Sequence, residues 1–228
     1  MDEQIAIAQT LKYAEGLRDL YAKEREQRHR AEEALAHLAE AYGSTVLALS
    51  VALDLRDDQT GGHAERVASL ALELTRTAAP DLVEDPQLQY GFLLHDVGKI
   101  GIPDAILLKP GPLTAAERAT METHTYLGER IVARVPYLGG LARQIVASHH
   151  ERWDGTGYPS RLGGQQIPPA ARIFALADAW DAMTNDRPYR NAMPIDRARQ
   201  EIERGAGTQF DPALVGPFLD LVGRQWAA

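Results

Sequence analysis

Five histidines and two aspartates recur along this chain at intervals that constrain its fold. The chain has 228 residues and seven histidines. The recurring set is His63, His95, Asp96, His124, His149, His150 and Asp178. Its successive groups lie 32, 29, 25 and 29 residues apart. Each gap is about one helix and its connection, out and back, so one or two of these side chains per helix would meet inside a helical bundle.

The chemistry of this set predicts a metal site. Imidazole and carboxylate groups both bind divalent transition metals. A lone histidine on an apolar helix is more often a hydrogen-bonded core residue. However, Asp96 and Asp178 follow apolar stretches, where an unpaired charge is costly. We therefore expect a dinuclear site bridged by Asp96, in which the remaining ligands form two groups: His63, His95 and Asp178 on one ion, and His124, His149 and His150 on the other.

Composition narrows the class of protein. The net charge of -8 opposes binding to duplex nucleic acid or to an anionic membrane. The absence of cysteine excludes disulfides and thiolate ligands. The acidic start, Met1 to Glu3, does not resemble a signal peptide, and no apolar run approaches membrane-spanning length. These features predict a soluble cytoplasmic protein with no membrane segment.

The pattern of apolar residues predicts two parts. Residues 1–43 form a long helix, a candidate arm for homodimerisation or signalling, although the polar stretch from Lys23 to Arg30 interrupts its apolar seam. The alternative is a solvated helix. Residues 44–228 form the functional domain, with little strand signal. Its helices are predicted at 63–77, from 85 to about 94, from a capping box at Thr114 and Glu117, at 141–150, at 170–184 and from 211, with loops at 100–113 and 151–168.

Several motifs together resemble one protein family. They are GHAERV at 62–67, LHDVGKI at 94–100, HHERWDGTGYP at 149–159, DAWDAMT at 178–184, RPYR at 187–190 and QFDP at 209–212. This ordered set is similar to the HD-GYP family of bacterial cyclic di-GMP phosphodiesterases, from about residue 44 to the C-terminus. The resemblance implies an all-α, HD-type helical bundle with a central dinuclear metal site.

The resemblance also implies an activity. The seven residues of the recurring set match the metal positions of the family. The expected reaction is hydrolysis of cyclic di-GMP to linear pGpG, with a further step to GMP left open, by in-line attack of a metal-bridging hydroxide. Asp96 and Lys99 are the expected catalytic residues. Iron or manganese is favoured, and zinc, cobalt and nickel also suit these ligands.

Matching by position implies the substrate contacts. Lys99 would contact phosphate, Tyr158 would pack on the substrate, and Asp181 would lie near guanine. Arg187 and Arg190 would hold phosphate and base. Each has a simpler alternative, as a helix-end lysine, a turn tyrosine or surface charges.

One departure concerns a third metal, and two other functions stay open. Family members with a third ion resemble one another in a glutamate four residues before the first histidine, where this chain has Gln59. Two ions are therefore expected, and the second hydrolytic step is expected to be weaker. The chain could instead be a low-turnover receptor of cyclic dinucleotides, or an HD hydrolase of another nucleotide. The intact Gly157–Pro159 loop opposes a nucleoside polyphosphate but not a mixed cyclic dinucleotide.

Overall fold

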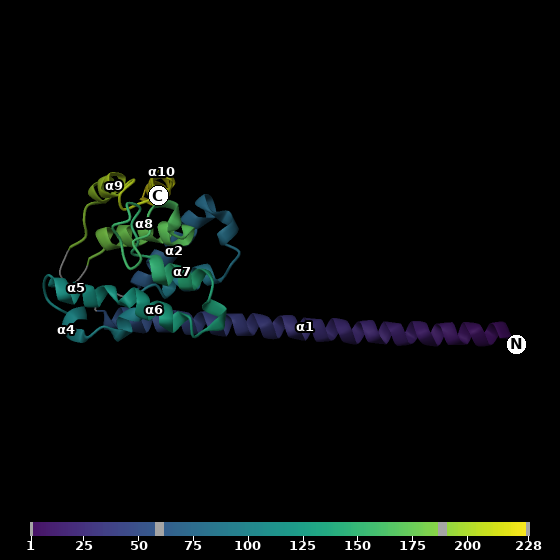
Figure 1. The fold of residues 1–228 in the computed structure, drawn as a ribbon. Helices are drawn as coiled ribbons and strands as arrows, with labels where there is room; N and C mark the ends of the chain where they lie inside the picture. The colour runs from purple at the N-terminus through teal and green to yellow at the C-terminus, as the bar shows by residue number, and fades with distance from the viewer. Residues whose placement is uncertain (1, 58–61, 187–190, 227–228) are drawn as a thin grey trace. The chain divides into compact units, whose positions relative to one another are not determined.

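The computed structural model describes residues 2–57, 62–186 and 191–226 (Figure 1). The chain divides into two compact units, Met1–Thr45 and Val46–Ala228. The described residues contain helices and two isolated bridges but no strand. The predicted all-α architecture is therefore confirmed.

A single long helix, α1 (Asp2–Arg56), accounts for the first unit. Every described side chain from Gln4 to Ala41 is exposed. The helix runs through residues 43 and 44, between which the two parts were predicted to divide, as the helical pattern of the sequence from Tyr42 to Leu53 indicates. Its last turns belong to the second unit. There it buries Val46, Ser50 and Asp54, which recur every four residues on one face.

One segment of α1, Leu11–Arg56, is long and apolar enough to cross a membrane, judged by length and composition alone. This corrects the expectation that no apolar run approaches that length. The apolar residues concentrate after the charged stretch, between residues 36 and 53. One such helix is weak evidence, because the core helix of a soluble protein and a signal sequence pass the same test.

The second unit contains nine further α-helices within the described residues. They are α2 (His63–Ala78), α3 (Gln87–Leu93), α4 (Asp104–Leu107), α5 (Ala115–Glu122), α6 (His124–Val132), α7 (Leu141–Ser148), α8 (Pro169–Thr184), α9 (Ile195–Arg204) and α10 (Pro212–Trp226). Four short 3-10 helices are η1 (Pro80–Leu82), η2 (Val97–Gly101), η3 (Pro136–Leu138) and η4 (Gly164–Gln166).

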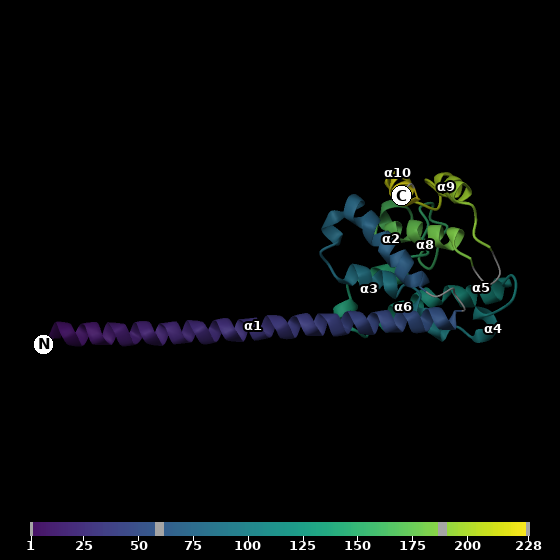
Figure 2. The ribbon, with the colours of Figure 1, turned by 180° about the vertical axis from the view of Figure 1, so that it is seen from behind.

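Helix α8 lies at the centre of this unit. It packs against α2, as Figure 2 shows, and against α7, α9 and α10. Its residues are apolar on most sides, and Phe174 is fully buried. The ring of Phe174 stacks on that of Phe92, with centroids 5.4 Å apart. Phe174 also lies 4.6 Å from the His95 ring, so the apolar core reaches directly to the candidate site.

Helices α3 and α7 approach closely because of a glycine. A Cβ on Gly91 would lie 2.6 Å from Ile145 Cδ1 and 2.8 Å from Ala142 Cα. Since both helices end at paired candidate ligands, this close packing sets the separation of the two pairs.

Most predicted helix starts are present. The capping box of Thr114 and Glu117 is complete. Asp85 and Asp211 accept hydrogen bonds from the backbone amides of Gln87 and Ala213. The predicted loop 100–113 instead contains α4, and α9 was not predicted.

Candidate metal centre

Six of the seven recurring residues lie at the ends of helices, and the seventh lies inside one. His63 and His124 are the first residues of α2 and α6, and Asp178 lies within α8. The pair His95–Asp96 directly follows α3 and its C-cap, and the pair His149–His150 directly follows α7. Turns at these positions allow adjacent side chains to point toward one centre.

The structure brings the seven side chains into two groups. The first comprises Asp96, His124, His149 and His150, and the second His63, His95 and Asp178. Within each group, one ligand atom per residue lies within 4.8 Å of the others. The two oxygens of Asp96 face different histidines: Oδ2 lies 3.1 Å from His95 Nε2, and Oδ1 lies 3.2 Å from His124 Nε2. Asp96 therefore has the position of a bridge between the groups.

Hydrogen bonds fix which nitrogen of each ring carries hydrogen. Three histidines donate from Nδ1 to the carbonyl of the residue three positions earlier: His95 to Phe92 (2.9 Å), His124 to Met121 (2.8 Å) and His149 to Val146 (3.0 Å). A carbonyl only accepts, so Nδ1 must carry the hydrogen in each ring. The neutral ring then presents a bare lone pair at Nε2. Histidines that bind metals are held in this way.

The bare nitrogens meet one another at the centre. His124 Nε2 lies 3.2 Å from His149 Nε2, and two lone pairs cannot form a hydrogen bond. Asp96 Oδ1 is buried and receives no hydrogen bond from the described part of the chain. Buried acceptors without donors are costly, and a cation between them removes that cost. The donor set therefore fits divalent metal ions.

Electrostatics favour the ligand forms of most of these groups. Burial, together with the neighbouring histidines, lowers the pKa of His149 and of His150. Burial opposes ionisation of Asp96, but Lys99 and His95 outweigh it, so the pKa of Asp96 lies well below its usual value. Neutral imidazole and ionised carboxylate are the forms that bind metal. Burial lowers the pKa of His95, but Asp96 and Asp178 outweigh it, so a proton competes with metal there.

Lys99 is held directly beside this centre. Its Nζ lies 2.8 Å from Asp96 Oδ2 and 2.6 Å from Asp57 Oδ2. Burial opposes its charge, but the two carboxylates outweigh it and raise the pKa of Lys99. The preceding residue, Gly98, permits the backbone of this segment to lie close to α6, since a Cβ there would lie 1.8 Å from the carbonyl oxygen of His124. Lys99 therefore stays a cation.

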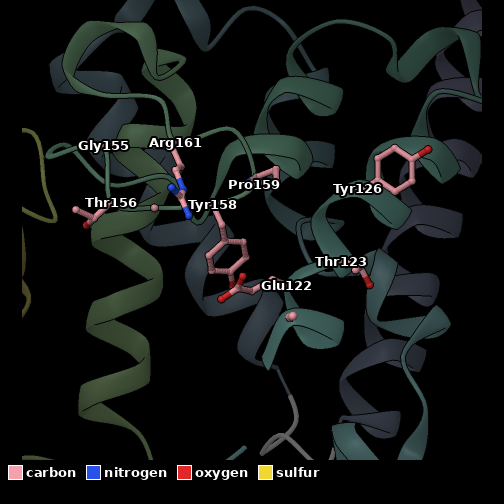
Figure 3. Close-up of a pocket in the computed structure, with 10 residues that line it drawn as sticks. Glu122, Thr123, Tyr126, Gly155, Thr156, Tyr158, Pro159 and Arg161 are labelled. Atoms are coloured by element: carbon pink, nitrogen blue, oxygen red, sulfur yellow. The ribbon is translucent and has the colours of Figure 1, made fainter. Parts of the chain in front are cut away.

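The loop that carries Tyr158 covers one side of the centre. The Tyr158 ring stacks on His150, with centroids 4.7 Å apart and planes at 30°. The buried Glu151 carboxylate fixes the loop by accepting from the amides of Ser160 (2.7 Å) and Leu162 (3.0 Å). Figure 3 shows the Tyr158 ring pointing from the loop toward Glu122 of α5.

Two cavities are lined in part by this loop. One of about 660 Å³ is lined by His149, His150, Tyr158 and Asp178, among others. A second of about 700 Å³, drawn in Figure 3, is lined by Tyr158, Glu122 and Arg161. The first cavity gives a ligand of nucleotide size direct access to the histidines.

Comparison with known proteins decides the family. Residues 48–214 match the HD domain family. The chain belongs to the HD domain family. The predicted HD-type fold and the resemblance to HD-GYP proteins are confirmed by this match and by curated relatives of this domain.

Two relatives and one solved structure illustrate the similarity. A cyclic di-GMP phosphodiesterase of Thermotoga maritima is 43% identical over 76% of this chain and 47% of its own length. A 3'3'-cGAMP-specific phosphodiesterase of Vibrio cholerae is 38% identical over 82% of this chain and 36% of its own length. The crystal structure of a cyclic GMP-AMP-specific phosphodiesterase of Vibrio cholerae shares the fold, with a TM-score of 0.57 and 24% identity over 78% of this chain and 48% of that one. The HD domain chain thus spans less than half the length of these proteins.

Asp181 has a different place in the HD domain from the one expected. The resemblance implies that it lies near guanine. Its side chain is only 7% exposed, and its oxygens accept from His63 Nδ1 (2.7 Å) and Arg66 Nε (2.6 Å). Asn185 Nδ2 adds a third donor at 2.9 Å. The carboxylate has little capacity left for a base, so the geometry does not support the guanine contact.

Three sequence-predicted positions lie outside the described residues: Gln59, Arg187 and Arg190. Sequence reasoning in turn missed Asp57, Arg66, Glu151 and Arg118, of which the last lines the cavity over the histidines. Glu151 lies within the HHERWDG motif, directly after the paired histidines, and that position was a usable signal. Arg66 lies within the GHAERV motif, which was a usable signal in the same way. Asp57 and Arg118 are single charges near helix ends, a pattern common on surfaces.

Proposed function

We propose that this chain is a metal-dependent phosphodiesterase that hydrolyses cyclic di-GMP to linear pGpG. The observation that carries the proposal is the buried convergence of bare imidazole nitrogens on the Asp96 carboxylate, 3.2 Å away at His124, beside the cation of Lys99 and below an open cavity. The similarity to a cyclic di-GMP phosphodiesterase of Thermotoga maritima supports this substrate.

The proposed cofactors are two divalent transition-metal ions, with iron or manganese favoured. The proposed ligands form the two groups described above, with Asp96 shared between them: His63, His95, Asp178, His124, His149 and His150. Ions bound there would supply Lewis acidity toward a phosphoryl oxygen and lower the pKa of water. The site would thus be locally positive in a chain of net charge -8, as an anionic substrate requires.

The residues of the chain would then orient the substrate and balance its charge. Lys99, at 2.8 Å from Asp96, would stabilise the charge that develops as the ribose 3' oxygen leaves. Tyr158 would offer a ring face to a guanine base. Arg187 and Arg190 remain predicted contacts to phosphate and base.

A mixed cyclic dinucleotide is a second candidate substrate. A 38% identical relative is a 3'3'-cGAMP-specific phosphodiesterase, and the described cavity contacts do not select between the two purines. A receptor that binds without turnover is a third possibility, but a receptor needs no complete set of metal donors.

Hydrolysis assays distinguish these functions. Purified protein loaded with Mn²⁺ or Fe²⁺ is incubated with cyclic di-GMP, 3'3'-cGAMP and a nucleoside polyphosphate, and the products are separated by chromatography. Asp96→Ala and His124→Ala should abolish cleavage, whereas His37→Ala, on the exposed face of α1, should not. Tight binding without cleavage would establish the receptor. Faster cleavage of 3'3'-cGAMP would assign that substrate, and activity retained by Asp96→Ala would refute the proposed site.

A cytoplasmic location and a homodimer formed through α1 complete the proposal. The location rests on the similarity to cyclic di-GMP phosphodiesterases. The homodimer rests on the exposed apolar side chains of α1, such as Leu35 and Leu38.

A further inference from the structure

Residues at the C-terminal end of α1 form an ion pair and hydrogen bonds with the segment that carries Lys99. Asp57 directly follows the helix, and its Oδ2 lies 2.6 Å from Lys99 Nζ. Arg56, the last residue of α1, donates from Nη1 to the carbonyl of Lys99 (2.5 Å) and from Nη2 to the carbonyl of Ile102 (2.8 Å). Two adjacent residues thus hold both the ammonium and the backbone of the same lysine.

These contacts are partly buried. The side chains of Asp57 and Lys99 are 11% and 14% exposed. An ion pair at such burial is costly to break, because one charge is left without its partner. Arg56 is 30% exposed, and a third contact, to Asp104 Oδ1 at 2.9 Å, orients its guanidinium. The guanidinium of arginine presents its donors in a fixed planar fork, whereas the ammonium of a lysine is a compact charge on a flexible stem.

Two carboxylates restrict the position of the Lys99 ammonium more than one would. With Asp96 as its single partner, the ammonium could move between the two oxygens of that carboxylate. Asp57 provides a second carboxylate, so that Nζ is fixed between two carboxylate oxygens, at 2.6 Å and 2.8 Å. A pre-positioned cation does not have to reorganise when charge develops on the substrate, so that free-energy cost is avoided during the reaction.

We propose that Asp57 and Arg56 are positioning residues that hold Lys99 at the reaction centre, so that the end of α1 sets the competence of the site. This inference rests on the proposed function of Lys99 and deepens it. Neither residue is one of the proposed metal ligands.

The rate of lysine acylation measures how firmly Asp57 and Arg56 hold Lys99, and this measurement does not depend on catalysis. The chain has four lysines, at positions 12, 23, 99 and 109. Within the described part of the chain, Lys109 pairs with one carboxylate, Glu117, and is 30% exposed, so it is the matched internal control. With a water-soluble acylating reagent and mass spectrometry, Lys99 should react slowly in the wild type. In Asp57→Asn its rate should rise toward that of Lys109, and Asp57→Glu should restore protection.

Kinetics test whether the contacts of Asp57 and Arg56 with Lys99 affect the reaction. In Asp57→Asn, kcat on cyclic di-GMP should fall about 10–100-fold with KM changed less than about twofold, as for other supporting residues. Bound metal should stay constant by elemental analysis, and Asp57→Glu should recover most of the loss. Asp196→Asn, which neutralises an exposed acid on α9, is the control for charge.

Arg56→Lys provides a second variant if Asp57→Asn does not fold. It keeps the charge but loses the fork, and it should also expose Lys99 to acylation and lower kcat. Unchanged acylation of Lys99, or a kcat equal to that of Asp196→Asn, would overturn the inference while leaving the phosphodiesterase intact. A wild type that cleaves no cyclic dinucleotide would instead refute the proposed function. The acylation rates would still show whether Asp57 and Arg56 hold Lys99 in place.

Discussion

Asp181 shows how one buried carboxylate can orient a candidate ligand. It accepts from His63 Nδ1 at 2.7 Å, which leaves Nε2 bare and facing Asp178 Oδ1 at 3.6 Å. In Asp181→Asn, the amide can turn its NH₂ toward His63 and favour the wrong tautomer. We expect metal affinity to fall about 10–100-fold, the usual loss for a supporting carboxylate. Competition with a fluorescent chelator measures this affinity.

Asp220→Asn, an exposed acid on α10, is the control and should bind metal as the wild type does. If Asp181→Asn binds metal normally but loses affinity for the nucleotide, the original prediction of a guanine contact is right and the positioning role is wrong.

Gly157 determines where Tyr158 lies. A Cβ at this position would lie 2.4 Å from Arg152 N and 2.6 Å from both Glu151 Cα and the carbonyl oxygen of His150. All three atoms are backbone, so the loop itself must move. Gly157→Ala should therefore cost about 1–3 kcal/mol of stability, as overpacking does, and displace Tyr158 from His150. Denaturant unfolding and cleavage assays measure both effects.

Gly216→Ala is the matched control, because nothing lies within 4 Å of the added methyl. Normal KM and kcat in Gly157→Ala would show that Tyr158 has no part in binding the substrate.

The sequence indicated which residues are candidate metal ligands, but it did not indicate which groups orient each of them. The ligand set was visible because histidine is rare in this chain and five of its seven copies recur at helix spacing. The carbonyl partners of the rings, such as Phe92 and Met121, follow from turn geometry and leave no mark in residue type. Asp181 was recognised, but its partner His63 lies 118 positions away, and only the packing of α8 on α2 brings the two together.

At the scale of helices, the start of α5 is stabilised by a charge-dependent cap. Glu117 accepts from Lys109 Nζ (2.6 Å) and from the amide of Thr114 (2.8 Å). The ammonium of Lys109 first, and then the Thr114 donors, lower the pKa of Glu117 from 4.5 to about 2. A carboxyl whose pKa is lower in the folded state stabilises that state fully above its unfolded pKa. The contribution falls as pH decreases from 4.5 toward 2.

Glu117→Gln should therefore lower the denaturant midpoint of the protein most clearly above a pH of about 5, and the difference from the wild type should shrink as the pH falls to about 3. Glu84→Gln, at a position without a cap, is the control. A difference that stays constant over this range would show that the cap does not depend on the charge of Glu117.

The helices differed in how strongly the sequence announced them. Capping residues fixed the start of α5 because the Thr–Glu box needs only local contacts. Helix α4 has four residues, Asp104–Leu107, too few for any periodic signal. Helix α9 was missed although Ala198 and Ile202 recur four residues apart and are buried. Most of its other residues are charged, and this masked the narrow apolar face.

At the scale of the whole molecule, the ligand spacing constrained the architecture more than any local propensity did. Groups 25 to 32 residues apart can reach one centre only if each connection returns to it, and a helical bundle does this. The same reasoning could not divide the chain, because α1 continues without a break from Asp2 to Arg56 across the boundary between the units. A boundary inside a helix leaves no loop signature in the sequence.

The exposed apolar side chains of α1 carry a prediction about assembly. Leu17 and Leu38 are separated by three heptads, and Tyr21 and Leu35 by two, so they fall on the two core positions of one coiled-coil seam. These four side chains are 53%, 65%, 67% and 66% exposed in the single chain. A second copy would bury them, and the exposed area is unfavourable without a partner. We expect the wild type to sediment as a dimer at micromolar concentration. Leu35→Glu with Leu38→Glu should convert it to a monomer, because each partner would then bury two uncompensated charges.

Gln27→Glu is the matched control, because it adds a charge to the polar stretch of the same helix outside that seam, and it should leave the dimer intact. Sedimentation velocity over a range of concentrations separates the species. A wild type that stays monomeric throughout would contradict the seam and leave the apolar face of α1 to another partner. A dimer that survives both glutamates would instead mean that the second unit makes the contact. The stretch from Lys23 to Arg30 interrupts the seam, because eight charged or polar residues replace the apolar side chains of two core layers.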